Sequence, residues 1–243
     1  MKSPMKKLVI AVPLIAVIAL LVSGCSTTQQ NTAGAVWEQK TPIDLTRFGT
    51  IALKQPNTNG GVPLMQAMQD RISTRQFASE NITLEDLSGI LWSAYGINRE
   101  VGGRTVPSAF GIYPLKIYVV MVNGIYEYQP EKNELTPIAQ GDYRQYTGDD
   151  MSPYAATAPL NLLFYADYSK YKTGNAGLDT FLAGAGDRFV AVNTGTCIQD
   201  VYLYCASEGL KTVAHGTIDE AKMRELLQLD DQHKFVIAQT IGY

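Results

Sequence analysis

Arg71, Ser73 and Arg75 place two guanidinium groups and one hydroxyl within a short stretch of the chain. They follow an apolar-periodic segment from Pro63 to Met68, a pattern that indicates a helix. If this helix gives way to a turn near Ser73, the two arginines can face one anionic ligand from different backbone geometries. Because the rigid guanidinium fork matches phosphate oxygens two at a time, we expect a phosphate-binding segment here. The alternative is the solvated end of an amphipathic helix.

Two other short segments have the composition of a ligand-contacting backbone. The run Pro107-Ser108-Ala109-Phe110-Gly111 is typical of a turn, and its small side chains let a flat ligand approach the main chain closely. Gly216 ends the run Thr212-Val213-Ala214-His215, whose amides can bond the edge of a heteroaromatic ring. An ordinary strand-leading turn and a plain strand end are the alternatives.

The sequence lacks the usual hydrolytic, metal and nucleotide motifs. It contains no GxSxG elbow, HExxH, paired CxxC or Walker loop, and its 2 histidines exclude a histidine-rich metal site. Gly184 and Gly186 begin like a dinucleotide fingerprint, but Phe189 stands in place of the third glycine. The formal net charge of −3 and the lack of a basic run argue against nucleic-acid binding. We therefore expect no metal site and no nucleic-acid partner.

The N-terminus has the features of a secretory signal. Lys2, Lys6 and Lys7 precede an uncharged run from Leu8 to Val22. At about 15 residues this run is short of the roughly 20 that a membrane-spanning helix needs, and it matches the apolar core of a signal peptide. We therefore predict that residues 1–24 are a cleaved signal peptide.

The end of this signal, Val22-Ser23-Gly24-Cys25, resembles the lipobox of bacterial lipoproteins. Cleavage before Cys25 would leave this cysteine as the lipidated first residue, and several acyl chains on one residue anchor a protein stably. Residues 25–45 are then the lipidated cysteine and a tether, and residues 46–243 the folded domain. These features predict a protein of the bacterial cell envelope, lipid-anchored on a periplasmic or extracellular face. The alternative is an ordinary signal peptide with a chance cysteine.

The other two cysteines, Cys197 and Cys205, fall within one predicted helix. Their separation corresponds to about 12 Å along a helix axis, whereas a disulfide needs Cα atoms within about 7 Å of each other. We therefore expect two buried free thiols rather than a disulfide.

Helical and β-type patterns alternate along the rest of the chain, without internal repeats. Thr83 and Asp86 have the spacing of a helix N-cap. The Gly-rich stretch from Tyr168 to Arg188 has no clear period and predicts a loop or lid. Other predicted elements are a hairpin of residues 116–122 and 125–129 around Asn123-Gly124, strands at 160–166, 211–214 and 234–241, a helix at 196–208 closed by Gly209, and a helix from Thr217 with Glu220 in capping-box position. Together these predicted helices and strands indicate one α+β domain.

Five segments together carry a family pattern. They are Pro63–Phe77, Leu84–Trp92, Arg104–Ala109 with Tyr113–Leu115, Gln199–Leu210 and Gln239–Tyr243. In this order they resemble the FMN-dependent nitroreductase family over roughly residues 53–243. The most similar branch contains the dehydrogenases that oxidise azolines to azoles in modified peptides.

The resemblance implies a homodimeric α+β fold, a three-layer sandwich with an antiparallel-rich central sheet flanked by helices. Two FMN molecules would lie at the subunit interface. Arg71, Ser73 and Arg75 match the positions that contact the FMN phosphate, the ribityl chain and the pyrimidine edge of the ring.

The resemblance assigns two further contacts to the flavin. Pro107, Ser108 and Ala109 match a segment contributed by the partner subunit. Ala214, His215 and Gly216 match a loop whose backbone amides approach flavin N5 and O4. Asn193 and Thr194 match a polar position near the ring.

The implied function is that of a lipid-anchored FMN-dependent oxidoreductase that transfers two electrons to or from a small organic or peptide-derived substrate. No acid–base side chain is obligatory for such chemistry. Nicotinamide cofactors are scarce outside the cytoplasm, so the electron donor stays open. The alternative is a non-catalytic flavin- or ligand-binding scaffold of the same fold. One departure from the family pattern favours this scaffold slightly. Many relatives continue past the position of Tyr243 with a basic residue that binds the phosphate. His215 is a candidate substitute for that residue.

Overall fold

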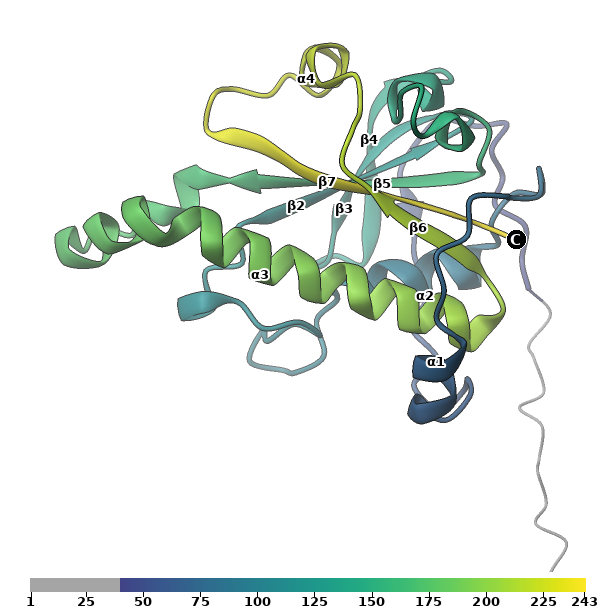
Figure 1. Cartoon of the computed structure of the whole chain (residues 1–243), viewed down its shortest axis with the longest axis horizontal. Helices are drawn as coiled ribbons and strands as arrows, with labels where there is room; N and C mark the ends of the chain where they lie inside the picture. Colours follow the sequence, from purple (N-terminus) through teal and green to yellow (C-terminus); the bar gives the residue numbers. More distant parts are fainter. Residues whose placement is uncertain (1–39) are drawn as a thin grey trace, which may run out of the picture. The chain divides into compact units, whose positions relative to one another are not determined.

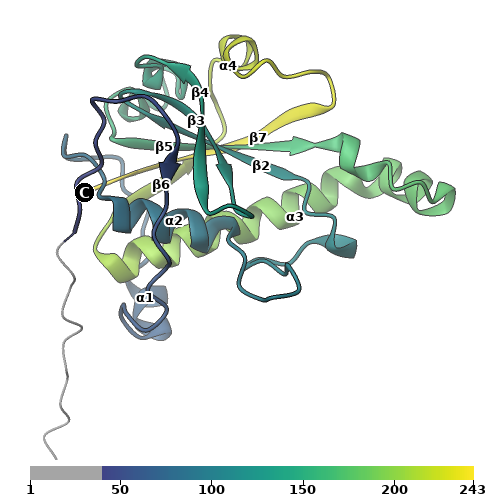
Figure 2. The same ribbon diagram turned by 180° about the vertical axis from the view of Figure 1, so that it is seen from behind.

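A seven-stranded sheet forms the centre of the computed structural model, which describes residues 40–243 (Figures 1 and 2). The strand order is β1-β4-β3-β2-β5-β7-β6, and every neighbouring pair is antiparallel. The strands are β1 (Ile51–Ala52), β2 (Leu115–Met121), β3 (Gly124–Gln129), β4 (Glu134–Gln140), β5 (Leu160–Asp167), β6 (Lys211–His215) and β7 (His233–Gly242). The helices are α1 (Leu64–Asp70), α2 (Leu84–Tyr95), α3 (Ala176–Glu208) and α4 (Glu220–Leu227), with short 3-10 helices η1 (Ala109–Gly111), η2 (Arg144–Tyr146), η3 (Pro153–Ala156) and η4 (Tyr168–Tyr171).

The expected signal peptide, Cys25 and the tether as far as residue 39 lie outside the described residues. Within residues 40–243, no helix combines the length and the apolar character needed to cross a bilayer.

Helices cover both faces of the sheet. α2 and α3 lie on one face and α4 on the other (Figure 1). The larger core, under α2 and α3, includes Leu87 and Val119, and the smaller core, under α4, includes Val120 and Met223. Val119 and Val120 belong to opposite cores because successive strand residues point to opposite faces. This arrangement confirms the predicted α+β sandwich with an antiparallel central sheet.

The central strands are apolar on both faces because both faces are covered. All residues of β5 are buried, and in β2 only Lys116 is partly exposed. Such strands appear in sequence as continuous apolar runs, which is why both could be predicted without alternating polarity.

The predicted β2–β3 hairpin is confirmed, with its turn displaced by one residue. The turn residues are Val122 and Asn123, whereas we expected Asn123 and Gly124. Gly124 begins β3 instead, and an added Cβ there would lie 2.4 Å from the Phe48 ring and 2.7 Å from the Ala139 carbonyl oxygen. Glycine is therefore required by close backbone packing and not by the turn conformation.

The predicted loop or lid between Tyr168 and Arg188 is wrong. Most of this stretch belongs to α3, which begins at Ala176 and not near residue 196, and which ends before Gly209 as expected. Asn175 caps the helix, since its side-chain oxygen accepts a hydrogen bond from the Leu178 amide at 3.1 Å.

The glycines of this stretch suggested flexibility, but one of them has a packing role. Gly186 is buried against Tyr171 of η4, and an added Cβ would lie 2.7 Å from the Tyr171 ring. The missing side chain therefore lets α3 approach η4 closely. Tertiary packing compensates the low helix propensity of glycine here.

The start of α2 was predicted correctly and the start of α4 was not. The Thr83 hydroxyl accepts a hydrogen bond from the Asp86 amide at 3.3 Å. For α4 we expected Thr217 to pair with Glu220 as a capping box. The cap is instead Asp219, whose carboxylate accepts a hydrogen bond from the amide three residues later at 2.9 Å. A carboxylate also complements the positive end of the helix dipole.

Two strands, β1 and β4, were not predicted. β1 pairs only with Glu134 and Leu135 at the start of β4. Farther along β4, Pro137 lies opposite Tyr126 beside an irregularity in the register. A proline cannot donate to a sheet ladder, so it is tolerated where no strand pairs on the outer side of β4.

The prediction for Cys197 and Cys205 is confirmed. Both are free thiols, buried on α3. Burial raises the pKa of both thiols far above the ordinary value, so they stay protonated at neutral pH.

One buried carboxylate links residues 40–45, which we assigned to the tether, to the domain. Asp86 is 1% exposed, and its Oδ1 lies 2.7 Å from Lys40 Nζ. Its Oδ2 accepts hydrogen bonds from the hydroxyls of Thr83 and Tyr243, both at 2.6 Å. The packed part of the chain thus extends to Lys40.

We predict that Asp86→Ala lowers the free energy of unfolding by about 3 kcal/mol, because one buried carboxylate serves three partners. Urea denaturation measures the change. Asp150→Ala, at an exposed position, is the matched control and should stay within about 0.5 kcal/mol of the parent protein. A loss below about 1 kcal/mol for Asp86→Ala would contradict the assigned role.

Candidate functional site

α1 ends earlier than expected, and the segment after it is extended. The last helical residue is Asp70, and Arg71 already has φ −58° and ψ 114°. The turn expected near Ser73 is absent. Since alternate side chains of an extended chain point to the same side, Arg71, Ser73 and Arg75 lie on one side of the segment. The two arginines thus share one side of an extended segment, which is a different geometry from the one we predicted.

Hydrogen bonds hold this segment on β6, the last strand of the sheet. Thr74 N donates to Thr212 O at 3.0 Å. Ser73 Oγ lies 2.9 Å from the hydroxyl of Tyr202 on α3, and the same hydroxyl accepts a hydrogen bond from Ala214 N at 2.9 Å. Tyr202 therefore joins the predicted arginine segment to the predicted backbone segment at the end of β6.

Arg71 also contacts Tyr202. Its guanidinium carbon lies 5.2 Å from the centroid of the Tyr202 ring, which is within cation–π range. In the described part of the chain, the Arg71 side chain makes no hydrogen bond or ion pair. Arg104 and Arg144, in contrast, each bind a carboxylate. The N–H donors of Arg71 are therefore available to a ligand.

Arg75 is connected to β6 through a second tyrosine. Tyr154 on η3 lies beside Arg75, and its ring stands edge-on to His215 with centroids 5.8 Å apart. Burial raises the pKa of Tyr154, and the charge of Arg75 opposes this rise. No carboxylate among residues 40–243 forms an ion pair with Arg75. Two guanidiniums without counter-charges on one side of a segment form a suitable anion site.

The His215 side chain is engaged within the protein. Its Nε2 lies 3.0 Å from Thr240 Oγ1, and its Nδ1 lies 3.2 Å from the carbonyl oxygen of Thr217. Burial lowers the pKa of His215, which favours the neutral ring at neutral pH. An imidazole whose two nitrogens already face partners within the protein is a poor phosphate ligand, so the backbone of His215 is the better candidate for a ligand contact.

The residues at the end of β6 differ in how accessible their backbone is to a ligand. The amide of Ala214 already donates to Tyr202. Gly216 is exposed, and an added Cβ there would meet no atom within 4 Å. Gly216 therefore leaves the most room for a flat ligand.

Pro107, Ser108 and Ala109 lie apart from the arginine segment within one chain. Asn193 Nδ2 donates to the carbonyl oxygen of Pro107 at 2.7 Å. Asn193 and Tyr202 are about 13 Å apart along the axis of α3. The structure of one chain therefore does not bring this segment to Arg71, and its contribution by a partner subunit stays a prediction.

Asn193 and Thr194 accompany this segment. Thr194 Oγ1 donates to the Val190 carbonyl at 2.8 Å, whereas Asn193 Oδ1 is buried without a hydrogen-bond partner among the described residues. The backbone just after Ala109 is unusual as well, since Phe110 and Tyr113 have φ of 55° and 51°. Non-glycine residues in this conformation concentrate at functional positions.

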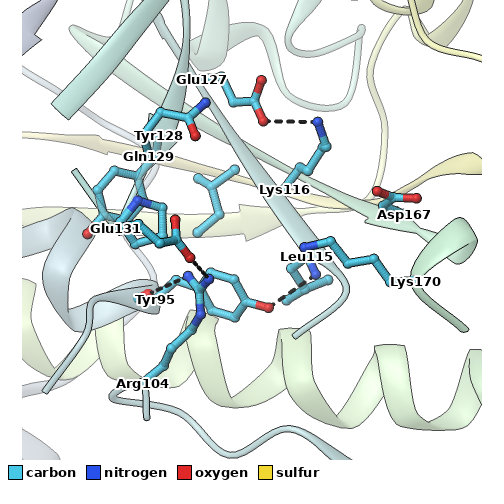
Figure 3. Close-up of a pocket in the computed structure, with 12 residues that line it drawn as sticks. Tyr95, Arg104, Leu115, Lys116, Glu127, Tyr128, Gln129, Glu131, Asp167 and Lys170 are labelled. Atoms are coloured by element: carbon cyan, nitrogen blue, oxygen red, sulfur yellow. Dashed lines mark hydrogen bonds and ion pairs between the residues drawn. The ribbon is translucent and has the colours of Figure 1, made fainter. Parts of the chain in front are cut away.

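A separate cavity of about 330 Å³ lies between β2, β3 and the loop after α2 (Figure 3). Its charged groups are largely satisfied by the protein. Arg104 lies 2.6 Å from Glu131 and stacks on Tyr95, and Lys116 lies 3.0 Å from Glu127. This cavity is therefore a weaker candidate for binding an anion than the segment of Arg71 and Arg75.

Sequence reasoning missed the two tyrosines that organise the site. Tyr202 lies in an apolar helical pattern, and Tyr154 in a segment without periodicity. Nothing in their spacing distinguishes them from core aromatics. The assembled site can bind a phosphate-bearing ligand on the arginine side and a flat group near Gly216.

Comparisons with known proteins agree on one family. The model of the nitroreductase family matches residues 68–243. A nitroreductase-family protein from Methanocaldococcus jannaschii is 31% identical over 182 residues, which cover 70% of this chain and 86% of that protein. The crystal structure of a nitroreductase-family protein from Ralstonia eutropha JMP134 has a TM-score of 0.71 and 32% identity, and the match covers 84% of this chain and 92% of that chain.

Two more distant structures share the fold. A Desulfovibrio desulfuricans protein in complex with FMN has a TM-score of 0.52 at 18% identity, over 74% of this chain and 86% of that chain. The Escherichia coli microcin synthetase McbBCD, with truncated pro-MccB17 bound, has a TM-score of 0.56 at 19% identity, over 79% of this chain and 77% of that chain. With a family model that spans most of its length and a relative that is similar along nearly the whole domain, this chain belongs to the nitroreductase family.

Proposed function

We propose that this protein is a lipid-anchored oxidoreductase that uses FMN to transfer two electrons to or from a small organic or peptide-derived substrate. The observation that carries the proposal is the position of Arg71, Ser73 and Arg75 on one side of a segment bound to β6, without carboxylate partners among residues 40–243. Membership of the nitroreductase family supports the oxidoreductase activity.

The described residues fit FMN. Arg71 supplies unused charged donors and Ser73 a hydroxyl, and a phosphate dianion is the complementary ligand. Gly216 leaves open space for the flat ring at the end of β6. A protein of the same fold contains FMN. When bound, FMN supplies the two-electron redox chemistry, and the protein positions and tunes it.

Each side chain then has a separate task. Arg71 and Ser73 hold the phosphate and the ribityl chain. Arg75, which matches the position at the pyrimidine edge, would stabilise negative charge on the ring. At 4 Å and an effective dielectric of 20, one such charge contributes about 4 kcal/mol, which is an upper limit because Arg75 is exposed.

The active unit in this proposal is a homodimer. Pro107, Ser108 and Ala109 lie away from the arginine segment of their own chain, so a partner has to supply them to a shared site. The apolar side chains of Leu64, Met65 and Ile72 are exposed on and after α1, Met65 by 74%. An apolar surface of this kind is typical of a subunit interface.

For the substrate class, the proposal follows the branch that the sequence segments resemble. The five sequence segments resemble azoline dehydrogenases, and the fold is shared with McbBCD, whose structure contains a truncated pro-peptide. The sequence resemblance favours a peptide-derived azoline over a nitroaromatic, quinone or enone. Exposing FMN-loaded protein to each class under aerobic and reducing conditions separates the candidates.

The test of the function uses soluble residues 26–243. We expect a yellow protein with a flavin spectrum, or a colourless one that FMN reconstitutes, and a dimer by light scattering. Protein that stays colourless in excess FMN would support the non-catalytic scaffold instead. A stable monomer that retains FMN would contradict the shared site.

A further inference from the structure

We infer that Tyr202 is a positioning residue that makes this site select FMN over riboflavin. It does so through Arg71, which is expected at the phosphate, and through Ser73, whose hydroxyl, matched above to the ribityl chain, this inference places at the phosphate end of that chain. This inference rests on the proposed function, and it assigns a role to a residue of the Gln199–Leu210 segment that had been given no contact with the flavin.

The position of Tyr202 is fixed by its surroundings. The residue is 8% exposed and lies on α3, under the segment that follows α1. Its hydroxyl accepts a hydrogen bond from the Ala214 amide, which is itself fixed in β6 by pairing with β7. The Tyr202 hydroxyl is therefore held in place, and its hydrogen bond orients the Ser73 side chain.

The directions of the hydrogen bonds at Tyr202 determine which way the hydroxyl hydrogen of Ser73 points. The Ala214 N–H can only donate, so it occupies one lone pair of the Tyr202 hydroxyl. Between Tyr202 and Ser73, 2.9 Å apart, either hydroxyl can be the donor. If the tyrosine donates, the hydroxyl hydrogen of Ser73 points away from the protein and is free for an anionic oxygen. The phenol of tyrosine is a better donor than the aliphatic hydroxyl of serine. Hydrogen bonds that follow one another in the same direction and end on an anion also strengthen one another.

The ring of Tyr202 has a second effect, on Arg71. The guanidinium lies 5.2 Å from the ring centroid, and this contact restricts a side chain with no other polar partner in the described chain. Holding the guanidinium in place lowers the entropy lost on binding a ligand. Both effects act on a phosphate oxygen, which riboflavin lacks.

Tyr204 is the matched control. It lies on the same helix, half-buried, and burial raises its pKa as for other tyrosines of the core. Its hydroxyl makes no hydrogen bond to residues 40–243. Tyr204→Phe therefore removes the same atom from the same helix without touching Ser73 or Arg71.

The experiment titrates the full-length apoprotein in detergent with FMN and, separately, with riboflavin, and follows the quenching of flavin fluorescence. For Tyr202→Phe we expect the Kd of FMN to rise about fivefold, as for the loss of one hydrogen bond, and the Kd of riboflavin to change less than twofold. Tyr202→Leu, which also removes the ring, should raise the Kd of FMN further. Tyr204→Phe should leave both constants unchanged. Circular dichroism confirms that each variant is folded.

A double-mutant cycle tests the route through Ser73. Since Tyr202 acts on the phosphate through Ser73, adding Tyr202→Phe to Ser73→Ala should cause little further loss of FMN affinity. The inference is overturned if Tyr202→Phe leaves the FMN affinity unchanged, or weakens both flavins equally, in a parent protein that binds FMN. A parent protein that binds neither flavin overturns the proposed function itself, and this inference with it.

Discussion

Replacing Arg71 by alanine is expected to raise the Kd for FMN by about tenfold to a hundredfold while the fold stays intact. A charge-assisted hydrogen bond is worth about 1.5–3 kcal/mol, and each 1.4 kcal/mol corresponds to a factor of ten in affinity. Arg71 contributes little to folding, because its guanidinium has no polar partner among the described residues and contacts only the Tyr202 ring. Fluorescence titration and the flavin content after gel filtration measure the effect.

Two further variants sharpen this prediction. Arg71→Lys keeps the charge but loses the planar fork, so its FMN affinity should lie between those of the parent protein and Arg71→Ala. Arg47→Ala removes an exposed arginine that belongs to the segment before β1, and it should leave FMN binding unchanged. Flavin retention by Arg71→Ala equal to that of the parent protein would place the phosphate elsewhere.

Cys25→Ala is expected to move nearly all of the protein from the membrane fraction to the soluble fraction. In our proposal the acyl chains on Cys25 are the anchor, at about 0.8 kcal/mol for each buried CH₂, so losing them removes the attachment. Cell fractionation and incorporation of labelled fatty acid measure the change.

Ser26→Ala is the control for this experiment, because it alters the neighbouring position and keeps the lipidated cysteine. It should retain the label and stay with the membranes. Persistent membrane association of Cys25→Ala would argue against the lipobox and for another means of attachment. The result bears on localisation alone, since Cys25 is not among the residues of the proposed flavin site.

Local signals identified several elements because the relevant interactions are themselves local. The cap of α2 depends on Thr83 and Asp86, which are three residues apart. The strands β2 and β5 appeared as continuous apolar runs because helices cover both of their faces. The free state of Cys197 and Cys205 followed from helical spacing alone.

Other elements depend on contacts between distant parts of the chain. The glycines between Tyr168 and Arg188 suggested a loop, yet Gly186 is helical because Tyr171 packs where a Cβ would be. Gly124 was assigned to the turn, although Phe48 and the backbone of β4 are what require a glycine there. In both cases a long-range contact outweighs the local preference of glycine.

The sequence by itself determined the α+β class and the family, and it predicted the arginine segment as a phosphate site, because these depend on residue types and their order. Only the tertiary structure decided how the site is assembled. The extended backbone after Asp70 puts Arg71, Ser73 and Arg75 on one side, and Tyr202 on a distant helix joins Arg71 and Ser73 to β6. A sequence pattern records the neighbours of a residue along the chain, whereas this hydroxyl bridges three segments that meet only when the sheet and α3 have packed.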